Sequence, residues 1–273
     1  MSGQPAANPP VTPGATLTRA GTDSGGVVGP GGVTVVTGAT RGIGRAIVDH
    51  LLAIGQPVVG IARSEDDGFP APLVTADLSD RAATRDALAG ITRQWRVERL
   101  VNNAGFNEMQ PLGAIGDDDF DRIVAINLRA TLDCTQVLLP SIRAARSAEG
   151  EPVGRIVNIA SRSLLGRSGG SIYSAVKAGL VGYTRSWALE LAGEGVTVNC
   201  VAPGPVATAM FDRNNPPGDP RRAQMLAAVP MGRPGKPQEV AAAVAWFLSP
   251  AAGFTTGQTL YVCGGASIGQ TPV

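Results

Sequence analysis

The feature that most constrains the fold of this chain is a series of short apolar runs separated by longer segments of helical character. The runs are VTVVT from residue 33, PVVGIA from 57, LVTA from 73, RLVNNA from 99, GRIVNIA from 154, VTVNCVA from 196 and QTLYVC from 258. Continuous β-branched runs are typical of strands covered on both faces, and helices between them complete βαβ units. The pattern predicts one α/β domain with a doubly wound, seven-stranded parallel sheet flanked by helices.

Composition divides the 273 residues into two parts. Residues 1–32 are rich in Gly, Pro, Ser, Thr and Ala and contain no aromatic residue, so they bury too little apolar surface to offset their ordering entropy. They also lack the basic start and apolar run of a signal peptide. We expect a flexible extension over residues 1–32 and the folded domain over 33–273, with a long irregular substrate loop over about 208–237.

Charge and cysteine content argue against several functional classes. The 23 basic and 22 acidic residues give a net charge of +1, which favours neither nucleic acid nor a membrane surface, and no run of eighteen apolar residues is present. Cys134, Cys200 and Cys263 lack CxxC spacing, so we expect buried thiols in a cytoplasmic protein, with no disulfide framework and no metal site. The sole histidine, His50, is distant in sequence from Ser161, which argues against a Ser-His-Asp hydrolase.

A glycine-rich sequence, TGATRGIG at residues 37–44, follows the first predicted strand and opens a helix. Glycines in that position permit a tight turn and the close approach of a pyrophosphate to the positive helix N-terminus. The second predicted strand ends in Ala62 and Arg63, where a carboxylate would select against a 2′-phosphate. Arg63 and Arg41 together favour NADP(H), because guanidinium groups bind phosphates well; the alternative is that both are solvated surface charges.

Tyr173 and Lys177 are one helical turn apart in SIYSAVK, and Ser161 lies twelve residues upstream of the tyrosine. The spacing places both side chains on one helix face, where an ammonium group is expected to lower the pKa of the phenol. A serine hydroxyl can bind a substrate oxygen while the tyrosine passes it a proton. The alternative for the pair alone is an ordinary amphipathic helix.

In this order, the motifs resemble those of the short-chain dehydrogenases/reductases over residues 33–270. The matching residues are TGATRGIG, Asp77-Leu78, NNAG at 102–105, Asn127, Ser161, Tyr173 with Lys177, and PGPVAT at 203–208. The resemblance implies a Rossmann fold in which Tyr173 is the general acid or base and Ser161 holds the substrate oxygen. It further implies that Lys177 binds the nicotinamide ribose and that Asn127 anchors a water in a proton relay.

The resemblance also implies a set of cofactor contacts: Gly38, Thr40, Arg41, Gly42, Ile43, Gly44, Arg63, Asp77, Leu78, Asn103, Ala104, Gly105, Tyr173, Lys177, Pro203, Gly204, Val206 and Thr208. Four structural alternatives stay open. Asn127 caps or bends its helix, NNAG is only a turn, Asp77 is only an N-cap, or Ser163 takes the role given to Ser161.

The most similar subgroup contains the 3-oxoacyl-carrier-protein reductases, which share AGLVGYTRS and VTVNCVAPG in similar form. Those enzymes dock an acidic carrier through basic residues at positions where this chain has Pro152 and Glu194. A carrier protein is therefore disfavoured as a partner, although Arg143 and Arg146 offer compensation. Cys263 stands where the family often has aspartate, a change that we expect to bear on subunit assembly.

We expect an NADP(H)-dependent oxidoreductase that interconverts a small-molecule ketone and a secondary alcohol, as a homotetramer. The alternatives are a 3-oxoacyl-carrier-protein reductase and a non-catalytic nucleotide-binding regulator. A mostly apolar pocket, and hence a hydrophobic substrate, is predicted from the residues expected to border it: Phe106, Arg162, Leu164, Leu165, Gly166, Met210 and Phe211.

Overall fold

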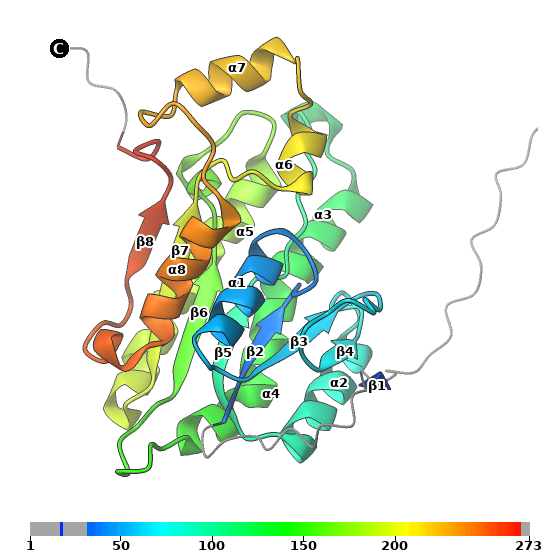
Figure 1. Ribbon diagram of the computed structural model, residues 1–273. Coiled ribbons are helices and arrows are strands. Elements are labelled where there is room, and N and C mark those ends of the chain that lie inside the picture. The colour runs from blue at the N-terminus through cyan, green and yellow to red at the C-terminus, as the bar shows by residue number, and fades with distance from the viewer. Residues whose placement is uncertain (1–16, 19–31, 269–273) are drawn as a thin grey trace, which may run out of the picture.

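The computed structural model of the protein describes residues 17–18 and 32–268, and all seven predicted parallel strands are present (Figure 1). They are β2 Val33–Thr37, β3 Val58–Ala62, β4 Leu73–Thr75, β5 Val97–Asn102, β6 Arg155–Ile159, β7 Thr197–Pro203 and β8 Thr259–Val262. The order along the sheet is β4-β3-β2-β5-β6-β7-β8. The chain therefore builds one half of the sheet outward from β2 and then the other half outward from β5. This confirms the predicted doubly wound Rossmann fold.

The sheet has one strand that the sequence did not indicate. Strand β1, Leu17–Thr18, pairs antiparallel with β4 and extends that edge to an eighth strand. It lies inside the segment predicted to be a flexible extension, where no strand was expected. The rest of residues 1–31 lies outside the described part of the chain.

Helices cover both faces of the sheet, as buried strands require. Helices α1 Gly42–Ala53 and α8 Pro237–Leu248 lie side by side on one face (Figure 1). Helices α2 Arg81–Gln94, α4 Ala130–Ala144 and α5 Ser171–Leu191 cover the other. Alternate residues of β2 enter the two cores, with Val36 packed under α1 and α8 and Val35 packed toward α2 and α4.

The segment predicted as an irregular loop contains two helices, α6 Ala209–Asn214 and α7 Pro220–Ala227, which lie beyond the carboxyl ends of the strands (Figure 1). Its two ends are joined by an isolated parallel bridge between Val206 and Gly235. The N–H of Ala207 donates to the carbonyl oxygen of Gly235 at 2.9 Å, and the N–H of Gly235 donates to Pro205 at 2.8 Å. We call residues 208–234 the lid segment.

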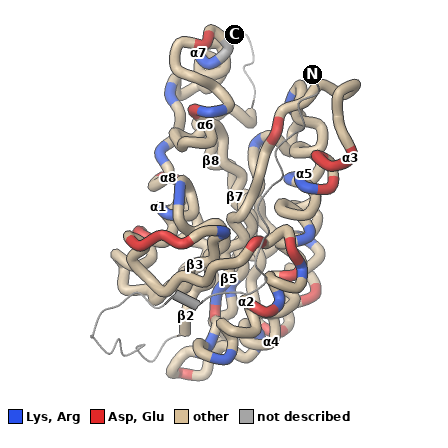
Figure 2. The backbone as a smooth tube through the Cα atoms, turned by 90° about the vertical axis from the view of Figure 1, so that its right-hand side faces the viewer, with Lys and Arg blue, Asp and Glu red and all other residues tan. Residues whose placement is uncertain are grey.

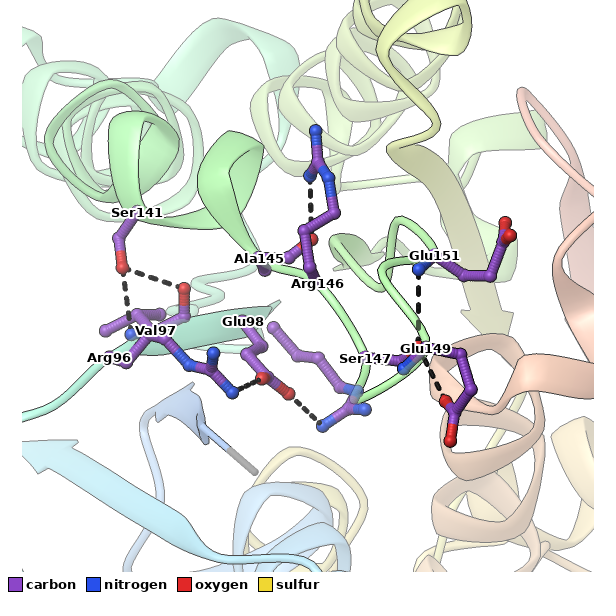
Figure 3. A network of polar contacts seen from close by, with 10 residues as sticks. Arg96, Val97, Glu98, Ser141, Ala145, Arg146, Ser147, Glu149 and Glu151 are labelled. Atoms are coloured by element: carbon purple, nitrogen blue, oxygen red, sulfur yellow. Dashed lines mark hydrogen bonds and ion pairs between the residues drawn. The ribbon is translucent and has the colours of Figure 1, made fainter. Parts of the chain in front are cut away.

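Polar side chains at the amino ends of the strands pair with one another (Figure 3). Glu98 on β5 forms ion pairs with Arg96 at 2.6 Å and Arg99 at 3.2 Å. The hydroxyl of Ser141 on α4 accepts from the N–H of Val97 and donates to its carbonyl oxygen, both at 2.9 Å. These contacts fix the start of β5 against α4.

Charged residues of both signs are spread over the molecule (Figure 2). All three cysteines are free and buried, as predicted. None of the helices in residues 32–268 has the length and apolar content needed to cross a membrane.

Candidate active site

Helix α5 and the segment before it bring Ser161, Tyr173 and Lys177 together at the carboxyl ends of β6 and β7. Ser161 lies two residues after β6 in an extended conformation and N-caps the short 3₁₀ helix η3, Arg162–Leu165, by accepting from the N–H of Ser163 at 3.1 Å. The Ser161 hydroxyl also acts on the phenol of Tyr173 and lowers its pKa. Ser163 is buried and contributes backbone contacts, through its N–H to Ser161 and its carbonyl oxygen to Gly166, so the structure favours Ser161 over Ser163 for the serine role.

The expected low pKa of Tyr173 is wrong for this structure. Burial raises the pKa of Tyr173 from 10.0 to about 12, and the hydrogen bond from Ser161 and the charge of Arg167 only partly offset that effect. The Lys177 ammonium lies 5.6 Å from the centre of the phenol ring and is directed elsewhere. Tyr173 is therefore protonated at neutral pH, which is the form needed to donate a proton.

Lys177 is almost completely buried, with 3% of its surface exposed. Its Nζ donates to the carbonyl oxygen of Ile159 at the end of β6, at 2.9 Å. Desolvation lowers its pKa from 10.5 to about 8, and the nearby Cys200 partly opposes that shift. The lysine is thus held by the strand with N–H donors left over, a position suited to binding a sugar hydroxyl.

Asn127 lies in a single π-helical turn, Ala125–Arg129, between α3 Asp117–Val124 and α4. Its fully buried side chain donates to the carbonyl oxygens of Phe106 at 2.8 Å and Ile123 at 2.9 Å. Asn127 therefore does stabilise the local helix, as the structural alternative proposed. Its Oδ1, however, is buried and has no partner among the described residues, so an acceptor is left for a water.

Gly105 separates Asn127 from Lys177. A Cβ on this residue would lie 2.9 Å from the Asn127 Oδ1 and 3.3 Å from the Lys177 Nζ. Both polar atoms therefore approach the Gly105 backbone so closely that a larger residue would displace one of them. The two groups assigned to a proton relay lie on either side of this glycine.

The glycine-rich loop is held against the end of β5 by Asn103. The Asn103 side-chain amide donates to the carbonyl oxygens of Thr37 and Gly38 at 2.9 and 3.1 Å. The Thr37 hydroxyl accepts from the N–H groups of Asn103 and Ala104. NNAG is thus more than a turn, because it ties two neighbouring strands together beneath the proposed cofactor.

The N-terminus of α1 fits a phosphate-bearing ligand. Gly38 and Gly42 adopt left-handed φ angles of 65° and 57°, and a Cβ on Gly44 would overlap the carbonyl oxygen of Gly38. The helix has no side-chain N-cap and no acidic residue in its first turn. Its free N–H groups and positive dipole end therefore face outward beside Thr40, Arg41 and Ile43.

The adenosine end of the predicted site is open and positively charged. Arg41 and Arg63 are both exposed, and neither forms an ion pair with another residue of the described chain. Asp77 accepts from the N–H and the hydroxyl of Ser79, whereas the N-cap of α2 is Asp80. The alternative that Asp77 is only an N-cap is therefore wrong. Leu78 borders a small depression together with Thr37 and Ala104.

The nicotinamide end is bordered by the start of the lid segment. Thr208 N-caps α6 through the N–H of Phe211, and its methyl group would lie 3.4 Å from a Cβ on Gly42. Pro203 ends β7, and Gly204 is in close contact with Cys263 at the end of β8. The predicted residues Pro203, Gly204, Val206 and Thr208 therefore follow one strand end that leads to the N-terminus of α1.

A buried polar chain beneath the site was not identified from the sequence. The amide of Asn102 donates to the Asn158 Oδ1 at 2.9 Å, and the amide of Asn158 donates to the Thr184 hydroxyl at 2.9 Å. This chain connects β5 and β6 to the helix that bears Tyr173 and Lys177. The available signal was an asparagine next to the apolar residues of each strand, because buried polar groups require partners.

The residues on which the carrier-protein question depends lie close together, and two of them form an ion pair. Arg143 forms an ion pair with Glu194 at 2.9 Å, and Arg146 donates to the carbonyl oxygens of Arg143 and Ala145. Pro152 is packed against Gly195. Glu194 therefore neutralises Arg143, whereas Arg146 is held by backbone carbonyl groups and has no carboxylate partner among the described residues.

Comparison with known proteins agrees with this geometry. A family model described as enoyl-(acyl carrier protein) reductase matches residues 38–267. The 3-oxoacyl-[acyl-carrier-protein] reductase of Salmonella typhimurium is 38% identical over 245 residues, 86% of this chain and 97% of that protein. The ligand-free aldohexose dehydrogenase of Thermoplasma acidophilum has a TM-score of 0.80 at 30% identity, covering 89% of this chain and 96% of its own.

A blue fluorescent protein from a metagenomic library, solved in complex with NADPH, has a TM-score of 0.77 at 34% identity over 86% of this chain and 97% of its own. These relatives share the whole α/β domain with this chain, rather than a fragment of it. The protein therefore belongs to the short-chain dehydrogenase/reductase family, whose members are oxidoreductases of alcohol and carbonyl groups.

Proposed function

We propose that this protein is an NADP(H)-dependent reductase of a ketone, or the dehydrogenase of the matching secondary alcohol. The observation that supports it most strongly is the grouping of Ser161, Tyr173 and the buried Lys177, together with an uncapped glycine-rich helix N-terminus. When bound, the dinucleotide supplies or accepts the hydride. The site residues assigned from the sequence keep their proposed roles.

Ser161 and Tyr173 act on the same substrate oxygen. The Ser161 hydroxyl holds the carbonyl, and the phenol of Tyr173 transfers its proton to the oxygen as negative charge develops there. A phenol with a pKa of about 12 is fully protonated at neutral pH, so it can donate a proton when the carbonyl group is reduced. In the oxidative direction the same group must first lose its proton.

Lys177 and Asn127 restore the proton. Lys177 binds the ribose through its Nζ while staying anchored to the Ile159 carbonyl. The unpartnered Oδ1 of Asn127 holds a water in the space next to Gly105. This water connects the buried lysine to solvent, and the proton lost by Tyr173 is replaced along that path.

The preference for NADP(H) over NAD(H) follows from Arg41 and Arg63. Both guanidinium groups are free among the described residues, and no carboxylate ends β3. The NADPH-bound relative supports the same cofactor. We further propose a cytoplasmic homotetramer, as the family resemblance implies.

Reduction of a 3-oxoacyl group on a carrier protein is the second candidate, because the Salmonella relative carries that name. The ion pair between Arg143 and Glu194 weighs against it, since a docking surface for an acidic carrier needs unpaired positive charge.

The test is oxidation of NADPH, followed by absorbance, with a panel of ketones, free oxo acids and an acyl thioester. We expect turnover with at least one ketone and a much lower rate with NADH. A protein that binds NADPH and oxidises it with no member of the panel would be a nucleotide-binding regulator, contrary to the proposal. Activity confined to the carrier-bound thioester would favour the second candidate.

A further inference from the structure

We infer that Asn158 and Thr184 are positioning residues of the proposed reaction. They belong to a buried chain of hydrogen bonds that joins the helix of Lys177 to the helical turn of Asn127 from beneath the site. This inference rests on the proposed function and deepens it, because the chain holds the two ends of the proposed proton path at a fixed separation.

The first half of the chain runs from Asn127 to the sheet. The Thr131 hydroxyl donates to the carbonyl oxygen of Asn127 at 3.1 Å, and the Thr135 hydroxyl donates to that of Thr131 at 2.8 Å. The amide of Asn102, the last residue of β5, donates to the Thr135 hydroxyl at 3.1 Å. The π-helical turn and the start of α4 are thereby attached to the carboxyl end of β5.

The second half runs from the sheet to α5. Asn102 and Asn158 are paired in the parallel register of β5 and β6, and their side chains are hydrogen-bonded at 2.9 Å. The Asn158 amide donates to the Thr184 hydroxyl at 2.9 Å, and that hydroxyl donates to the carbonyl oxygen of Leu180 at 2.8 Å. Both polar atoms of the Asn158 side chain are therefore used to join the two halves.

Water has little access to this chain. Its six polar residues are buried, with exposed fractions of 0–4%: Asn102, Asn127, Thr131, Thr135, Asn158 and Thr184. Hydrogen bonds are electrostatically strong in such surroundings, and removing one partner leaves another buried polar group unsatisfied. The chain therefore favours one relative position of α4 and α5, which apolar packing alone specifies less sharply.

The chain also limits sliding of α5 along β6. The Nζ of Lys177 donates to the carbonyl oxygen of Ile159, which directly follows Asn158. Thr184 lies two turns after Lys177 on the same face of the helix. If the bond between Asn158 and Thr184 were lost, the Lys177 bond alone would remain between α5 and β6 among the described side-chain hydrogen bonds.

The geometry above the chain leaves little tolerance. The Asn127 Oδ1 and the Lys177 Nζ would lie 2.9 and 3.3 Å from a Cβ on Gly105, on which they converge. Misplacing a reacting or orienting group by about 1 Å can lower a rate about 100-fold. A movement of α5 relative to the π-helical turn would displace Lys177 and Tyr173 together, so the chain acts on the reaction through these two residues.

The experiment compares Thr184→Val, which keeps the shape of the side chain but removes the hydroxyl, with Thr184→Ser, which keeps the hydroxyl. Thr84→Val is the matched control. Thr84 is also fully buried and donates to a carbonyl oxygen four residues back, that of Asp80, but it lies in α2 outside the chain. Thermal unfolding of each variant establishes that it is folded at the assay temperature.

We expect Thr184→Val to lower kcat about 10-fold at saturating NADPH, with KM for the ketone changed less than about threefold. Thr184→Ser should keep kcat within about threefold of the wild type, and Thr84→Val should lower Tm without changing kcat. Equal losses of kcat in Thr184→Val and Thr184→Ser, or a loss of the same size in Thr84→Val, would overturn the inference, because packing would then explain the effect.

The other end of the chain gives a second test. Thr135→Val should also lower kcat, and combining it with Thr184→Val should add little to either single loss, since both changes break one chain. Losses that multiply would show that the two threonines act independently and would overturn the inference.

A third readout needs no turnover. The affinity for NADPH, measured by fluorescence titration, should fall about 3- to 10-fold in Thr184→Val, because Lys177 is the group proposed to bind the ribose, and stay unchanged in Thr84→Val. If the wild type oxidised NADPH with no ketone, the proposed function would fail. The difference in NADPH affinity would still decide whether the chain positions Lys177.

Discussion

The amino and carboxyl ends of the strands both carry charged and polar residues. At the amino ends these groups are paired with each other, and at the carboxyl ends several are unpaired. At the amino ends, Glu98 lies between Arg96 and Arg99, and Ser141 satisfies both backbone groups of Val97 (Figure 3). At the carboxyl ends, Arg63 and Arg167 have no carboxylate partner in the described chain, and the buried Oδ1 of Asn127 has no donor.

Whether a polar group is paired, rather than its residue type, therefore distinguishes groups that stabilise the fold from groups that can bind a ligand. Polar groups that are paired with each other stabilise the fold, and polar groups oriented by the fold but left unpaired are available to ligands. The amino ends also contain exceptions, since the Nε atoms of Arg99 and Arg155 are buried without a partner. Those atoms are enclosed, however, whereas Arg63 and Arg167 are accessible.

The largest effect is expected from removing the proton donor at the carboxyl ends. Tyr173→Phe should lower kcat by about 10²- to 10⁴-fold, because it deletes the general acid while preserving the ring. Its affinity for NADPH, measured by fluorescence titration, should change little. Tyr183→Phe, in which the ring stacked on Trp187 is kept, is the control on the same helix. A Tyr173→Phe variant with most of its turnover would refute the assigned chemistry.

The matching change at the amino ends should affect stability instead. Glu98→Gln leaves Arg96 and Arg99 without their shared carboxylate, and we expect the free energy of unfolding to fall by about 3 kcal/mol. Urea denaturation measures this loss, and kcat of the folded variant should be unchanged. Glu151→Gln, at an exposed position of the same region, should have little effect. An active-site defect in a stable Glu98→Gln protein would contradict the proposed division.

A charge reversal at Arg63 tests whether an unpaired group binds a ligand. Arg63→Asp should reduce kcat/KM with NADPH by about 10- to 100-fold, because a charge-assisted contact to the 2′-phosphate is replaced by repulsion. The value with NADH should rise. Arg93→Asp, on the exposed side of α2, is the matched control. A wild-type preference for NADH would show that Arg41 and Arg63 are only solvated charges.

The smallest effect is the pH dependence of stability due to Lys177. Its pKa is about 8 in the folded protein and 10.5 in an unfolded chain, so between these values the unfolded state binds more protons. The free energy of unfolding should therefore rise with pH over this window relative to Lys177→Met, by about 1 kcal/mol at pH 9. Urea titrations at pH 7, 8 and 9 measure the difference. If the free energy of unfolding changed equally with pH in the two proteins, the pKa of Lys177 would not be lowered by burial.

The sheet was predictable because its strands are continuous apolar runs whose burial is visible in the sequence. Strand β1 was not, since two residues that pair with β4 leave no periodic signal. Helices α6 and α7 were hidden by the prolines and glycines of NNPPGDP, although Thr208 is a typical N-cap. Short elements of this kind depend on contacts made after the chain has folded.

In the site, positions along the chain could be predicted, but their electrostatics could not. Spacing places Lys177 on the same helix face as Tyr173, yet it does not show that the ammonium turns to Ile159 or that burial outweighs its charge. The unpartnered Oδ1 of Asn127 likewise leaves no sequence signal. Its burial depends on the π-helical turn that contains it, which only the folded chain reveals.

The bridge between Val206 and Gly235 has a consequence for how this protein can diversify. Because the two ends of the lid segment are joined to each other, insertions, deletions and replacements within it leave the strand ends and α8 in register. The lid segment can therefore be replaced without moving the catalytic residues. Substrate range can then evolve in residues 208–234 while the proton-transfer chemistry is inherited unchanged.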